Sequence, residues 1–426
     1  MNERITALRA FLDSAHSFFH TTANLAKILD EAGYTRLNES ADWTLVPGGK
    51  YYFTRGGSSV MAFRIPTTHP KGFMMSGTHC DHPTFRLKVN GELTGAYTRA
   101  ATEKYGGMIF SPWLDRPLSV AGRAMVETEN SLESRLVDID RDLVLLPHVA
   151  IHMNRNVNEG FTWNPAVDTI PLLGGANAKG RLMELLEEAA GGTILGADLY
   201  LYVRQKSSVW GVDNEFLSAP ALDNLLCVWG CAQGFLNATE TDSIPVMAVF
   251  DSEETGSNSR QGADSTMLSA TLTRISRCLS LDHDRMLANS MMVSADMAHA
   301  LHPNHPEFAD PANAPLMNGG VVLKFNAAKN YVTTGLSAAL FRKICAKANV
   351  PVQTFHNRAD IKGGSTLGYI SMNHVSVPSV DIGLAQLAMH SSYETAGVED
   401  PIHLENAMTA FYSSSLETDG DTYILN

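Results

Sequence analysis

Hydrophobic and polar residues follow two different periods in the first part of the chain. Across residues 21–32 the apolar positions share one face of a helix, and Gly33 follows as a helix stop. Across residues 51–65 apolar and polar positions alternate instead, with Gly56 and Gly57 in the middle. The pattern therefore predicts a helix followed by two strands joined by a glycine turn.

The next apolar run, residues 71–76, leads into the sequence Gly77-Thr78-His79-Cys80-Asp81 and stops there. A buried strand that ends in this way presents polar side chains at the carboxyl edge of a parallel sheet. In the second half of the chain such runs alternate with helical patterns, which is typical of an α/β fold. The predicted helices are residues 221–236, 265–279 and 335–348, and the predicted strands are residues 244–250, 291–295 and 379–382.

Between residues 91 and 210 the pattern changes to short β-like runs broken by Gly, Pro and Asn. Residues 143–151 and 199–203 predict strands, and residues 180–190 predict one helix. Because this stretch has few clusters of reactive side chains, we expect it to be a β-rich domain inserted into an α/β domain. The predicted catalytic domain comprises residues 1–90 and 211–426, and the predicted inserted domain comprises residues 91–210.

Composition and charge exclude several classes of protein. The 426 residues contain 32 Lys and Arg against 45 Asp and Glu, a net charge of −13, without a long basic run. Such a chain lacks the positive surface that binds nucleic acid or anionic membranes. No apolar stretch approaches the ~18 residues of a spanning helix, and residues 1–19 lack the pattern of a signal peptide. The five scattered cysteines argue against a disulfide framework, so we expect a cytoplasmic enzyme.

Polar clusters that follow apolar runs or begin helices contain two imidazoles and three carboxylates. These candidate metal ligands are His79, Asp223, Glu254, Asp296 and His390. Their nitrogen and oxygen donors suit zinc, cobalt or manganese, and the set can hold two divalent ions if one carboxylate is shared. Each cluster alone is a weak signal, because isolated His, Asp and Glu residues are common on surfaces. Their joint occurrence predicts a two-metal centre.

Two further carboxylates adjoin the predicted ligands. Glu253 precedes Glu254, and in such a doublet one carboxylate can bind metal while its neighbour accepts a proton from the attacking water. Asp81 lies two residues after His79 and can orient its ring through the second imidazole nitrogen. We therefore predict Glu253 as the general base and Asp81 as the partner of His79. A simple turn residue at the end of a strand is the alternative for Asp81.

The motifs around these residues resemble those of the aspartyl aminopeptidases, cytosolic di-zinc metallopeptidases that remove N-terminal Asp or Glu from peptides. The similarity runs in order over nearly the whole chain. The matching motifs include Gly48-Gly49-Lys50-Tyr51-Tyr52, Ala150-Ile151-His152, Ala221-Leu222-Asp223-Asn224, Ser294-Ala295-Asp296 and Ala388-Met389-His390-Ser391. The resemblance implies a three-layer α/β/α core interrupted by an insertion that builds dimers and then a tetrahedral dodecamer.

The resemblance also implies how the metal ligands divide their roles. Asp223 would bridge two zinc ions, and Glu254 would complete the second site. His79 would hold one metal, and Asp296 or His390 would supply a further ligand to each. Glu253 would be the general base, as its position beside a ligand already suggests.

Other residues are implied to bind substrate. Lys324 matches the lysine that in the family approaches the acidic side chain of the substrate, and Tyr331, Gly364 and Ser365 lie in motifs matched to substrate binding. His152 matches a histidine of the insertion that reaches a neighbouring subunit's active site. A histidine that only supports a strand is the alternative for His152.

The chain also departs from the family pattern. Gly363 stands where the family usually has Cys, and Asn330 and Tyr393 stand where it has Arg. Part of the expected basic surround is therefore missing, which leaves a broader-specificity aminopeptidase or a deacylase as alternatives. A catalytically weak oligomeric binding protein of the same fold is a third alternative. Glu253 argues against it, because a binding protein needs no carboxylate beside a ligand carboxylate.

Three histidines outside this set recur every third residue, at His299, His302 and His305. This spacing resembles a metal-binding helix, but Pro303 and Pro306 interrupt any continuous helix there. We therefore expect these histidines to support the active-site loop rather than to form a separate metal site.

Overall fold

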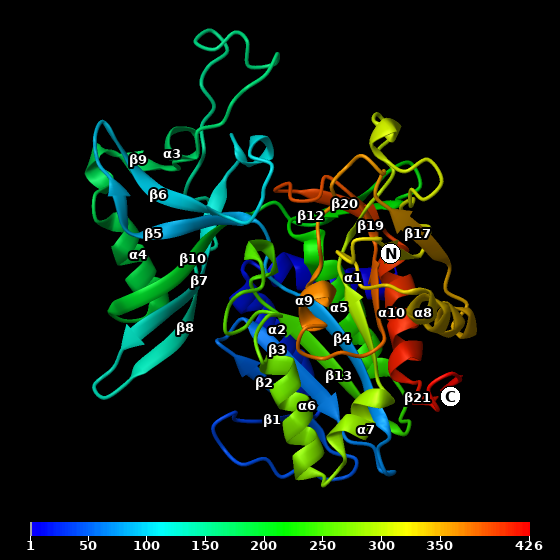
Figure 1. Cartoon of the computed structure of the whole chain (residues 1–426). Coiled ribbons are helices and arrows are strands. Elements are labelled where there is room, and N and C mark those ends of the chain that lie inside the picture. The colour runs from blue at the N-terminus through cyan, green and yellow to red at the C-terminus, as the bar shows by residue number, and fades with distance from the viewer. Residues whose placement is uncertain (1) are drawn as a thin grey trace.

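The structure, a computed structural model, describes residues 2–426 as two lobes that lie side by side (Figure 1). The larger lobe is built on a nine-stranded sheet. In spatial order this sheet contains β1 (Thr35–Arg36), β2 (Lys50–Arg55), β3 (Ser59–Arg64), β13 (Ser243–Phe250), β4 (Gly72–His79), β14 (Met291–Ala295), β18 (Ser379–Gly383), β16 (Val321–Phe325) and β17 (Val352–His356).

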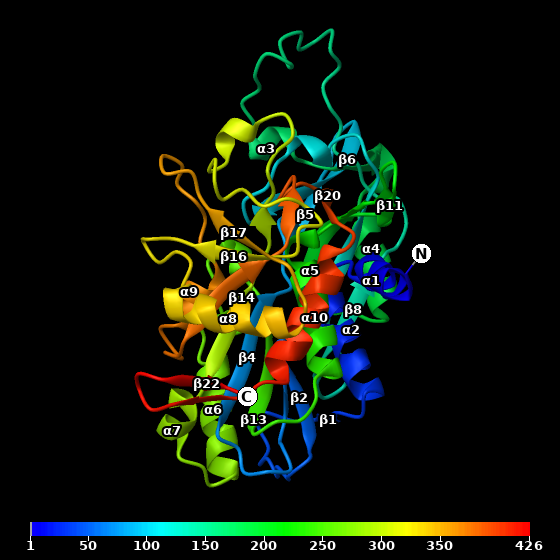
Figure 2. The same cartoon turned by 90° about the vertical axis from the view of Figure 1, so that its right-hand side faces the viewer.

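Helices cover both faces of this sheet. One hydrophobic core joins the sheet to α1 (Glu3–Ser14), α2 (Phe18–Glu31), α5 (Leu222–Asn237), α8 (Gly335–Lys347) and α10 (Asp400–Tyr412). A second core joins the opposite face to α6 (Met267–Cys278), α7 (His283–Ala288) and α9 (Leu367–Ser371). On the first face α5 and α10 pack against each other (Figure 2). None of the helices in residues 2–426 has the length and apolarity needed to cross a lipid bilayer.

The central strands divide their side chains between the two cores. On β4, Met74 belongs to the first core, whereas Phe73 and Met75 belong to the second. A strand buried on both faces requires this period of two together with an apolar residue at nearly every position. The predicted three-layer α/β/α core is therefore confirmed.

The smaller lobe is a six-stranded antiparallel sheet with a core of its own. Its elements are β5 (Thr84–Leu93), β6 (Tyr97–Tyr105), β7 (Leu118–Glu127), β8 (Leu132–Asp138), α3 (Pro165–Asp168), β9 (Leu172–Gly175), α4 (Arg181–Ala190) and β10 (Ile194–Val203). Because β5 begins at Thr84, this sheet contains residues on both sides of position 91. The functional division into a catalytic and an inserted domain stays a prediction.

The remaining elements are a five-stranded sheet, short 3₁₀ turns and a C-terminal hairpin. A five-stranded sheet contains β11 (Ser208–Trp210), β12 (Phe216–Ala219), β20 (Glu394–Gly397), β19 (Ala385–Leu387) and β15 (Ala298–His299). Short 3₁₀ turns occur at Ser111–Trp113, Ala176–Ala178, Glu253–Thr255 and Pro306–Phe308, and a C-terminal hairpin pairs β21 (Leu416–Thr418) with β22 (Tyr423–Leu425).

Most of the predicted elements lie within a few residues of observed ones, but the strand predicted at residues 143–151 is wrong. Val144 and Leu146 form only isolated bridges, and the chain has no strand from residue 147 to 151. Both side chains are buried in the core of the smaller lobe, whereas Val149 is 56% exposed. The apolar run therefore reflects local packing of a loop and not a continuous ladder of hydrogen bonds.

Candidate active site

The structure brings the five predicted ligands into two groups that share Asp223. In the first group His79 Nε2 lies 3.7 Å from Asp223 Oδ1 and 3.5 Å from Asp296 Oδ1. In the second group His390 Nε2 lies 3.4 Å from both Asp223 Oδ2 and Glu254 Oε1. In each group the donor atoms, one from each residue, all lie within 4.8 Å of one another. The two oxygens of Asp223 thus face different histidines.

The donor atoms fit a divalent cation. Asp223 Oδ1 and Glu254 Oε1 are buried and have no hydrogen-bond partner among residues 2–426. A buried carboxylate oxygen without a partner is costly, and a cation held between such oxygens removes that cost. The groups contain imidazole nitrogens and carboxylate oxygens but no thiolate, which suits zinc, cobalt or manganese.

Strand ends and turns place these ligands. His79 is the last residue of β4, Asp296 follows β14 directly, and Glu254 lies in the turn after β13. These three strands run parallel, so their carboxyl ends meet at one edge of the sheet. Asp223 lies in the first turn of α5, and His390 lies in the loop between β19 and β20.

The turns around the ligands hold several residues in left-handed backbone conformations. Positive φ angles occur at Ala221 (55°), Ser252 (66°), Ala388 (58°) and His390 (65°). None of these is a glycine, so each conformation carries a steric cost, of order 1–3 kcal/mol for strained residues in general. Such conformations persist where surrounding contacts hold the backbone in place.

Asp81 holds the turn that carries the acidic doublet. Its carboxylate accepts hydrogen bonds from the main-chain N–H of Glu253 at 3.1 Å and of Glu254 at 3.2 Å. His79 Nδ1 lies 3.0 Å from the carbonyl oxygen of Asp81 and 3.4 Å from its Oδ1. The carbonyl is therefore the closer acceptor for the imidazole N–H, and Nε2 is left to face Asp223 and Asp296.

Glu253 lies beside the ligands in a strongly acidic environment. Its carboxylate forms a third cluster with the donor atoms of His79 and Glu254. Burial raises the pKa of Glu253 to about 8; His79 opposes the rise and Asp296 adds to it. The carboxyl group of Glu253 can therefore hold a proton in these surroundings.

Glu394 is a site residue that sequence reasoning missed. Its buried carboxylate accepts hydrogen bonds from the main-chain N–H of Asp223 at 2.9 Å and of His390 at 2.6 Å. It therefore ties together two ligands that lie far apart in the sequence. The sequence signal that could have revealed Glu394 is an acidic residue at the start of a strand, four positions after His390.

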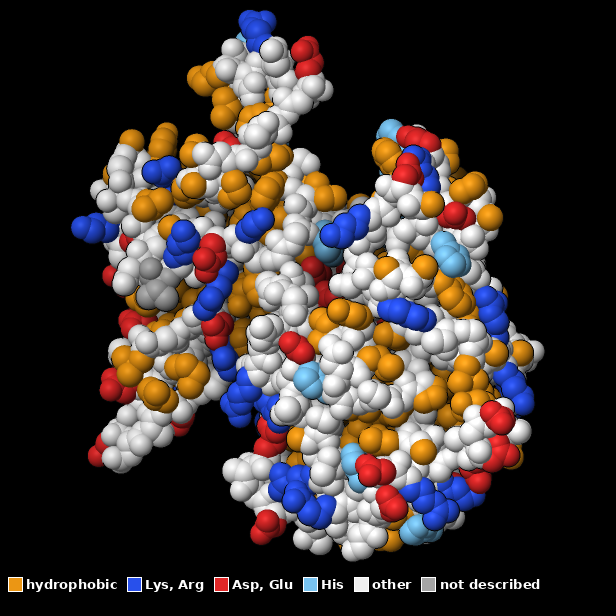
Figure 3. Space-filling model, viewed as in Figure 1, with side chains coloured by type: hydrophobic (Ala, Val, Ile, Leu, Met, Phe, Trp, Pro, Cys, Tyr) orange, Lys and Arg blue, Asp and Glu red, His pale blue; other side chains and the backbone are white. Residues whose placement is uncertain are grey.

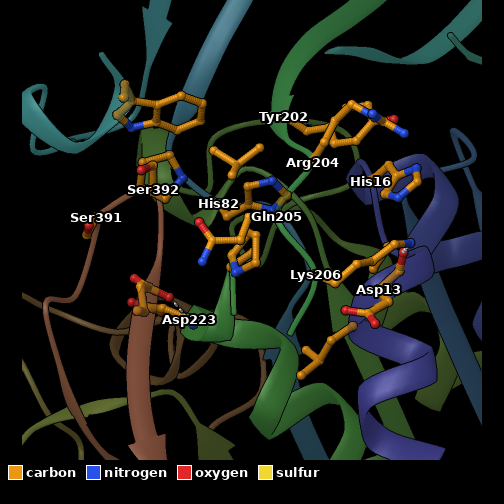
Figure 4. A pocket seen from close by; sticks show the side chains of 18 residues that line it. Asp13, His16, His82, Tyr202, Arg204, Gln205, Lys206, Asp223, Ser391 and Ser392 are labelled. Atoms are coloured by element: carbon orange, nitrogen blue, oxygen red, sulfur yellow. Dashed lines mark hydrogen bonds between the residues drawn. The ribbon is translucent and has the colours of Figure 1, made fainter. Parts of the chain in front are cut away.

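Two cavities are of interest: Asp223 lines the smaller one, and Ala388, two residues before His390, lines the larger one. The smaller one extends from Asp223 to residues 204–206, which connect β10 to β11 (Figure 4). Its volume of about 40 Å³ is room for about three waters at ~10–15 Å³ each, but not for a peptide side chain. In Figure 3 a hollow separates the two lobes, and acidic and histidine side chains are visible in it.

The larger cavity has a volume of about 450 Å³, within the ~300–1,000 Å³ range of small-molecule sites. Its lining includes Ala388, two residues before His390, and the predicted substrate-binding residue Gly364. Ser365 is exposed in the same loop. The cavity is also lined by four histidines, two basic side chains and one carboxylate, namely His299, His302, His305, His356, Arg358, Lys362 and Asp310.

Lys324 and Tyr331 are buried, and Lys324 contacts the candidate ligand Asp296. The Lys324 ammonium is buried and donates hydrogen bonds to the carbonyl oxygens of Asp296 at 3.0 Å and Met297 at 2.9 Å. It also lies 5.1 Å from the centre of the buried Tyr331 ring. Burial acts to raise the pKa of Asp296, but Lys324 and His79 together lower it.

His152 is the predicted site residue that the structure does not bring near the others. It lies in the long loop between β8 and α3, which projects from the smaller lobe (Figures 1 and 3). Its side chain is exposed and makes no hydrogen bond or ion pair with residues 2–426. Large apolar side chains on the same loop are exposed as well, Ile151 at 49% and Met153 at 82%.

Known proteins match nearly the whole chain. A family model described as aminopeptidase I zinc metalloprotease (M18) matches residues 11–412. A probable M18 family aminopeptidase 2 of Clostridium novyi is 40% identical over 419 residues, which are 95% of this chain and 97% of the relative. Its namesake from Pseudomonas aeruginosa strain LESB58 is 40% identical over 420 residues, with the same coverage.

Solved structures give the same result. A chain of "Cryo-EM structure of the Ape4 and Nbr1 complex" has a TM-score of 0.93 and 33% identity, and the match covers 96% of this chain and 85% of that one. A chain of "Structure of S. cerevesiae mApe1 dodecamer" has a TM-score of 0.85 and 25% identity, covering 96% of both chains. The prediction of an enzyme is thereby confirmed at the level of the family. With 95% of its sequence matched to M18 relatives and its candidate ligands gathered in two adjoining groups, this chain belongs to the M18 family of zinc metallo-aminopeptidases.

Proposed function

We propose that this aminopeptidase uses two divalent metal ions and prefers peptides that begin with Asp or Glu. The observation that carries the two-metal proposal is Asp223, whose oxygens face His79 on one side and His390 on the other. Asp296 would complete the first site and Glu254 the second. Zinc is the expected ion, with cobalt or manganese as alternatives. When bound, the ions supply a Lewis acid that polarises the scissile carbonyl and activates water.

Glu253 is proposed to move the proton. It would accept a proton from the attacking water and release it to the leaving amine. Asp81 holds the main chain at Glu253 and Glu254, which lets one carboxylate act as a base while its neighbour binds metal. The surrounding carboxylates would also attract the terminal ammonium of the peptide.

The preference for acidic residues is proposed to arise in the larger cavity. Arg358 lines it but is already paired with Asp360 at 2.6 Å, whereas Lys362 is exposed and has no ion pair within residues 2–426. An ammonium at the rim of such a cavity favours a carboxylate over a neutral side chain. Lys324, whose ammonium already has two carbonyl acceptors, is assigned to support Asp296.

We also infer a homo-oligomeric cytoplasmic enzyme in which His152 reaches the active site of another subunit. The exposed apolar side chains beside His152 support this, because large apolar patches are rarely left in water. A related structure is described as a dodecamer, which supports assembly through dimers into a tetrahedral dodecamer. Peptides would be the substrates.

Metal analysis and two variants test the metal and base assignments. The wild type should retain two equivalents of zinc per chain, and His79→Ala should lower both metal content and rate. Glu253→Gln should retain the metal and lose ~10²–10⁴-fold in kcat. A Glu253→Gln protein that binds no zinc would make Glu253 a ligand, and a fully active one would remove it from the mechanism.

Peptides that differ only in their first residue test the specificity. N-terminal Glu should be cleaved faster than Gln or Leu, whereas N-acetylated Glu should not be cleaved. Equal kcat/KM for Glu and Leu would leave an aminopeptidase of broader specificity. Cleavage of the acetylated peptide would indicate a deacylase.

A further inference from the structure

We propose that Tyr105 is a positioning residue for the metal centre, and that the smaller lobe takes part in this centre through residues 105–109, here called the strap. The strap begins at the last residue of β6 and contacts Asp81, Glu254 and His390. The inference rests on the proposed two-metal site and goes beyond it, because it assigns part of the metal binding to a segment that contains no metal ligand.

The first contact of the strap is the Tyr105 hydroxyl, which donates a hydrogen bond of 2.8 Å to Asp81 Oδ2. Asp81 in turn accepts the main-chain N–H groups of Glu253 and Glu254. The Tyr105 ring is held by Phe18 on α2, with ring centres 5.5 Å apart, and by Tyr200 on β10 at the same distance. Tyr105 therefore orients the carboxylate of Asp81, and this carboxylate in turn holds the main chain of Glu253 and Glu254.

The second contact of the strap is with His390. The main-chain N–H of Ile109 donates a hydrogen bond of 3.0 Å to the His390 carbonyl oxygen. On the same residue, Nε2 is the ring nitrogen that faces Asp223 and Glu254.

The third contact is the close packing of Gly106 against Glu254. A Cβ atom added to Gly106 would lie 3.1 Å from Glu254 Cβ, and the φ angle of +76° at Gly106 disfavours other residues. The strap thus touches Asp81, Glu254 and His390 within five consecutive residues. Hydrogen-bonding partners behind metal ligands commonly change metal affinity or activity by ~10–100-fold.

The test is the variant Tyr105→Phe, which removes one hydroxyl and keeps the ring. In the full-length protein we expect zinc to bind ~10–100-fold more weakly in competition with a chelator. We expect kcat to fall while KM stays close to the wild-type value, since the hydroxyl donates its hydrogen bond to Asp81 and not to a residue proposed to bind substrate. The melting temperature of the metal-free protein should fall by no more than the few degrees expected for one lost hydrogen bond, which separates positioning from general folding.

Tyr200→Phe is the matched control. Tyr200 belongs to the same aromatic cluster and is also buried, but its hydroxyl makes no hydrogen bond within residues 2–426. It should keep the wild-type zinc affinity and kcat. Gly106→Ala is a second variant, which should weaken zinc binding by displacing Glu254 even if the Tyr105 variant folds poorly.

The outcomes separate this inference from the function on which it rests. If the wild type binds zinc and Tyr105→Phe binds it equally well, the positioning role of Tyr105 is overturned and the proposed function stands. An equal loss in Tyr200→Phe would also overturn it, because the effect would then come from the aromatic cluster as a whole. A wild type that binds no zinc would overturn both proposals.

Discussion

Lys324 donates a hydrogen bond to the carbonyl oxygen of Asp296 at 3.0 Å, and the same ammonium lies 3.8 Å from the Asp296 carboxylate. The Lys324 side chain is 3% exposed, so this charge is largely shielded from solvent. The family resemblance implies that Lys324 approaches the acidic side chain of the substrate. The observed contacts point first to a partner of Asp296, and the two roles predict different phenotypes.

Lys324→Met should lower zinc content and reduce kcat/KM for all substrates, because removing one partner of a buried ion pair leaves the other uncompensated. Such changes typically cost ~3–5 kcal/mol of stability. The ratio of kcat/KM for N-terminal Glu over Gln should stay near the wild-type value. Zinc content and the kcat/KM values for the Glu and Gln peptides distinguish the two roles. Intact metal with a collapsed Glu/Gln ratio would instead assign Lys324 to the substrate.

Lys362→Ala should reduce the preference for Glu over Gln without loss of metal. An exposed ammonium contributes ~0.2–1 kcal/mol to a charge pair, so we expect a change of up to about fivefold that shrinks at high salt. Lys343→Ala is the control, since Lys343 is an exposed lysine of α8 outside the cavity lining. An unchanged ratio in Lys362→Ala would remove this lysine from substrate selection.

Mixing two inactive variants tests whether His152 acts in a neighbouring subunit. His152→Ala lacks the proposed donated histidine, and Glu253→Gln lacks the base. After subunit exchange, some sites should combine an intact His152 from one chain with an intact Glu253 from another. Activity should therefore reappear in the mixture but not in either variant alone. No recovery, despite exchange shown by mass spectrometry, would remove His152 from the neighbouring site.

Asp400 predicts a pH dependence of stability that is separate from the metal centre. Its carboxylate accepts hydrogen bonds from the N–H groups of Asn318 and Gly320, yet burial raises the pKa of Asp400 to about 6. The folded state therefore binds a proton more tightly than the unfolded state, where the pKa is ~3.9. The contribution of Asp400 to stability falls as the pH rises from about 4 to 6.

Asp400→Asn removes this ionisation. Relative to the wild type, the free energy of unfolding of the variant should improve by up to about 3 kcal/mol between pH 4 and pH 7. A constant offset is also expected, because the Asn amide places a donor opposite one of the two N–H groups. Thermal unfolding of both proteins with a chelator present measures the difference, which would be independent of pH if Asp400 did not titrate.

The pattern of the sequence predicts the layers well because the sheet is buried on both faces. Phe73, Met74 and Met75 form a continuous apolar run that suits a strand buried on both faces, and the abrupt change to polar residues at His79 marks its end. An apolar run gives a wrong strand prediction where its side chains pack into a core but the backbone forms no ladder of hydrogen bonds. Residues 143–151 are apolar like a strand but contribute bridges and buried side chains instead.

The supporting contacts of the site were harder to predict than its candidate ligands. His79 and Asp296 each terminate an apolar run, so local sequence makes them visible. Glu394 and Tyr105 act through hydrogen bonds to residues far away in the chain, 171 residues in one case and 24 in the other. No periodicity in a single sequence encodes such pairings, which arise only when the strands are assembled.

The path of the chain through the smaller lobe bears on how the protein can be redesigned. The chain leaves the core after His79, the last residue of β4, and returns before α5, whose first turn contains Asp223. A shortened protein that joins these two ends would keep every candidate ligand in its sequence. It would lose Tyr105 and the main-chain N–H of Ile109, which donates a hydrogen bond to the His390 carbonyl oxygen. The smaller lobe therefore cannot simply be exchanged for another domain. A replacement domain would also have to rebuild the hydrogen bonds to Asp81 and His390.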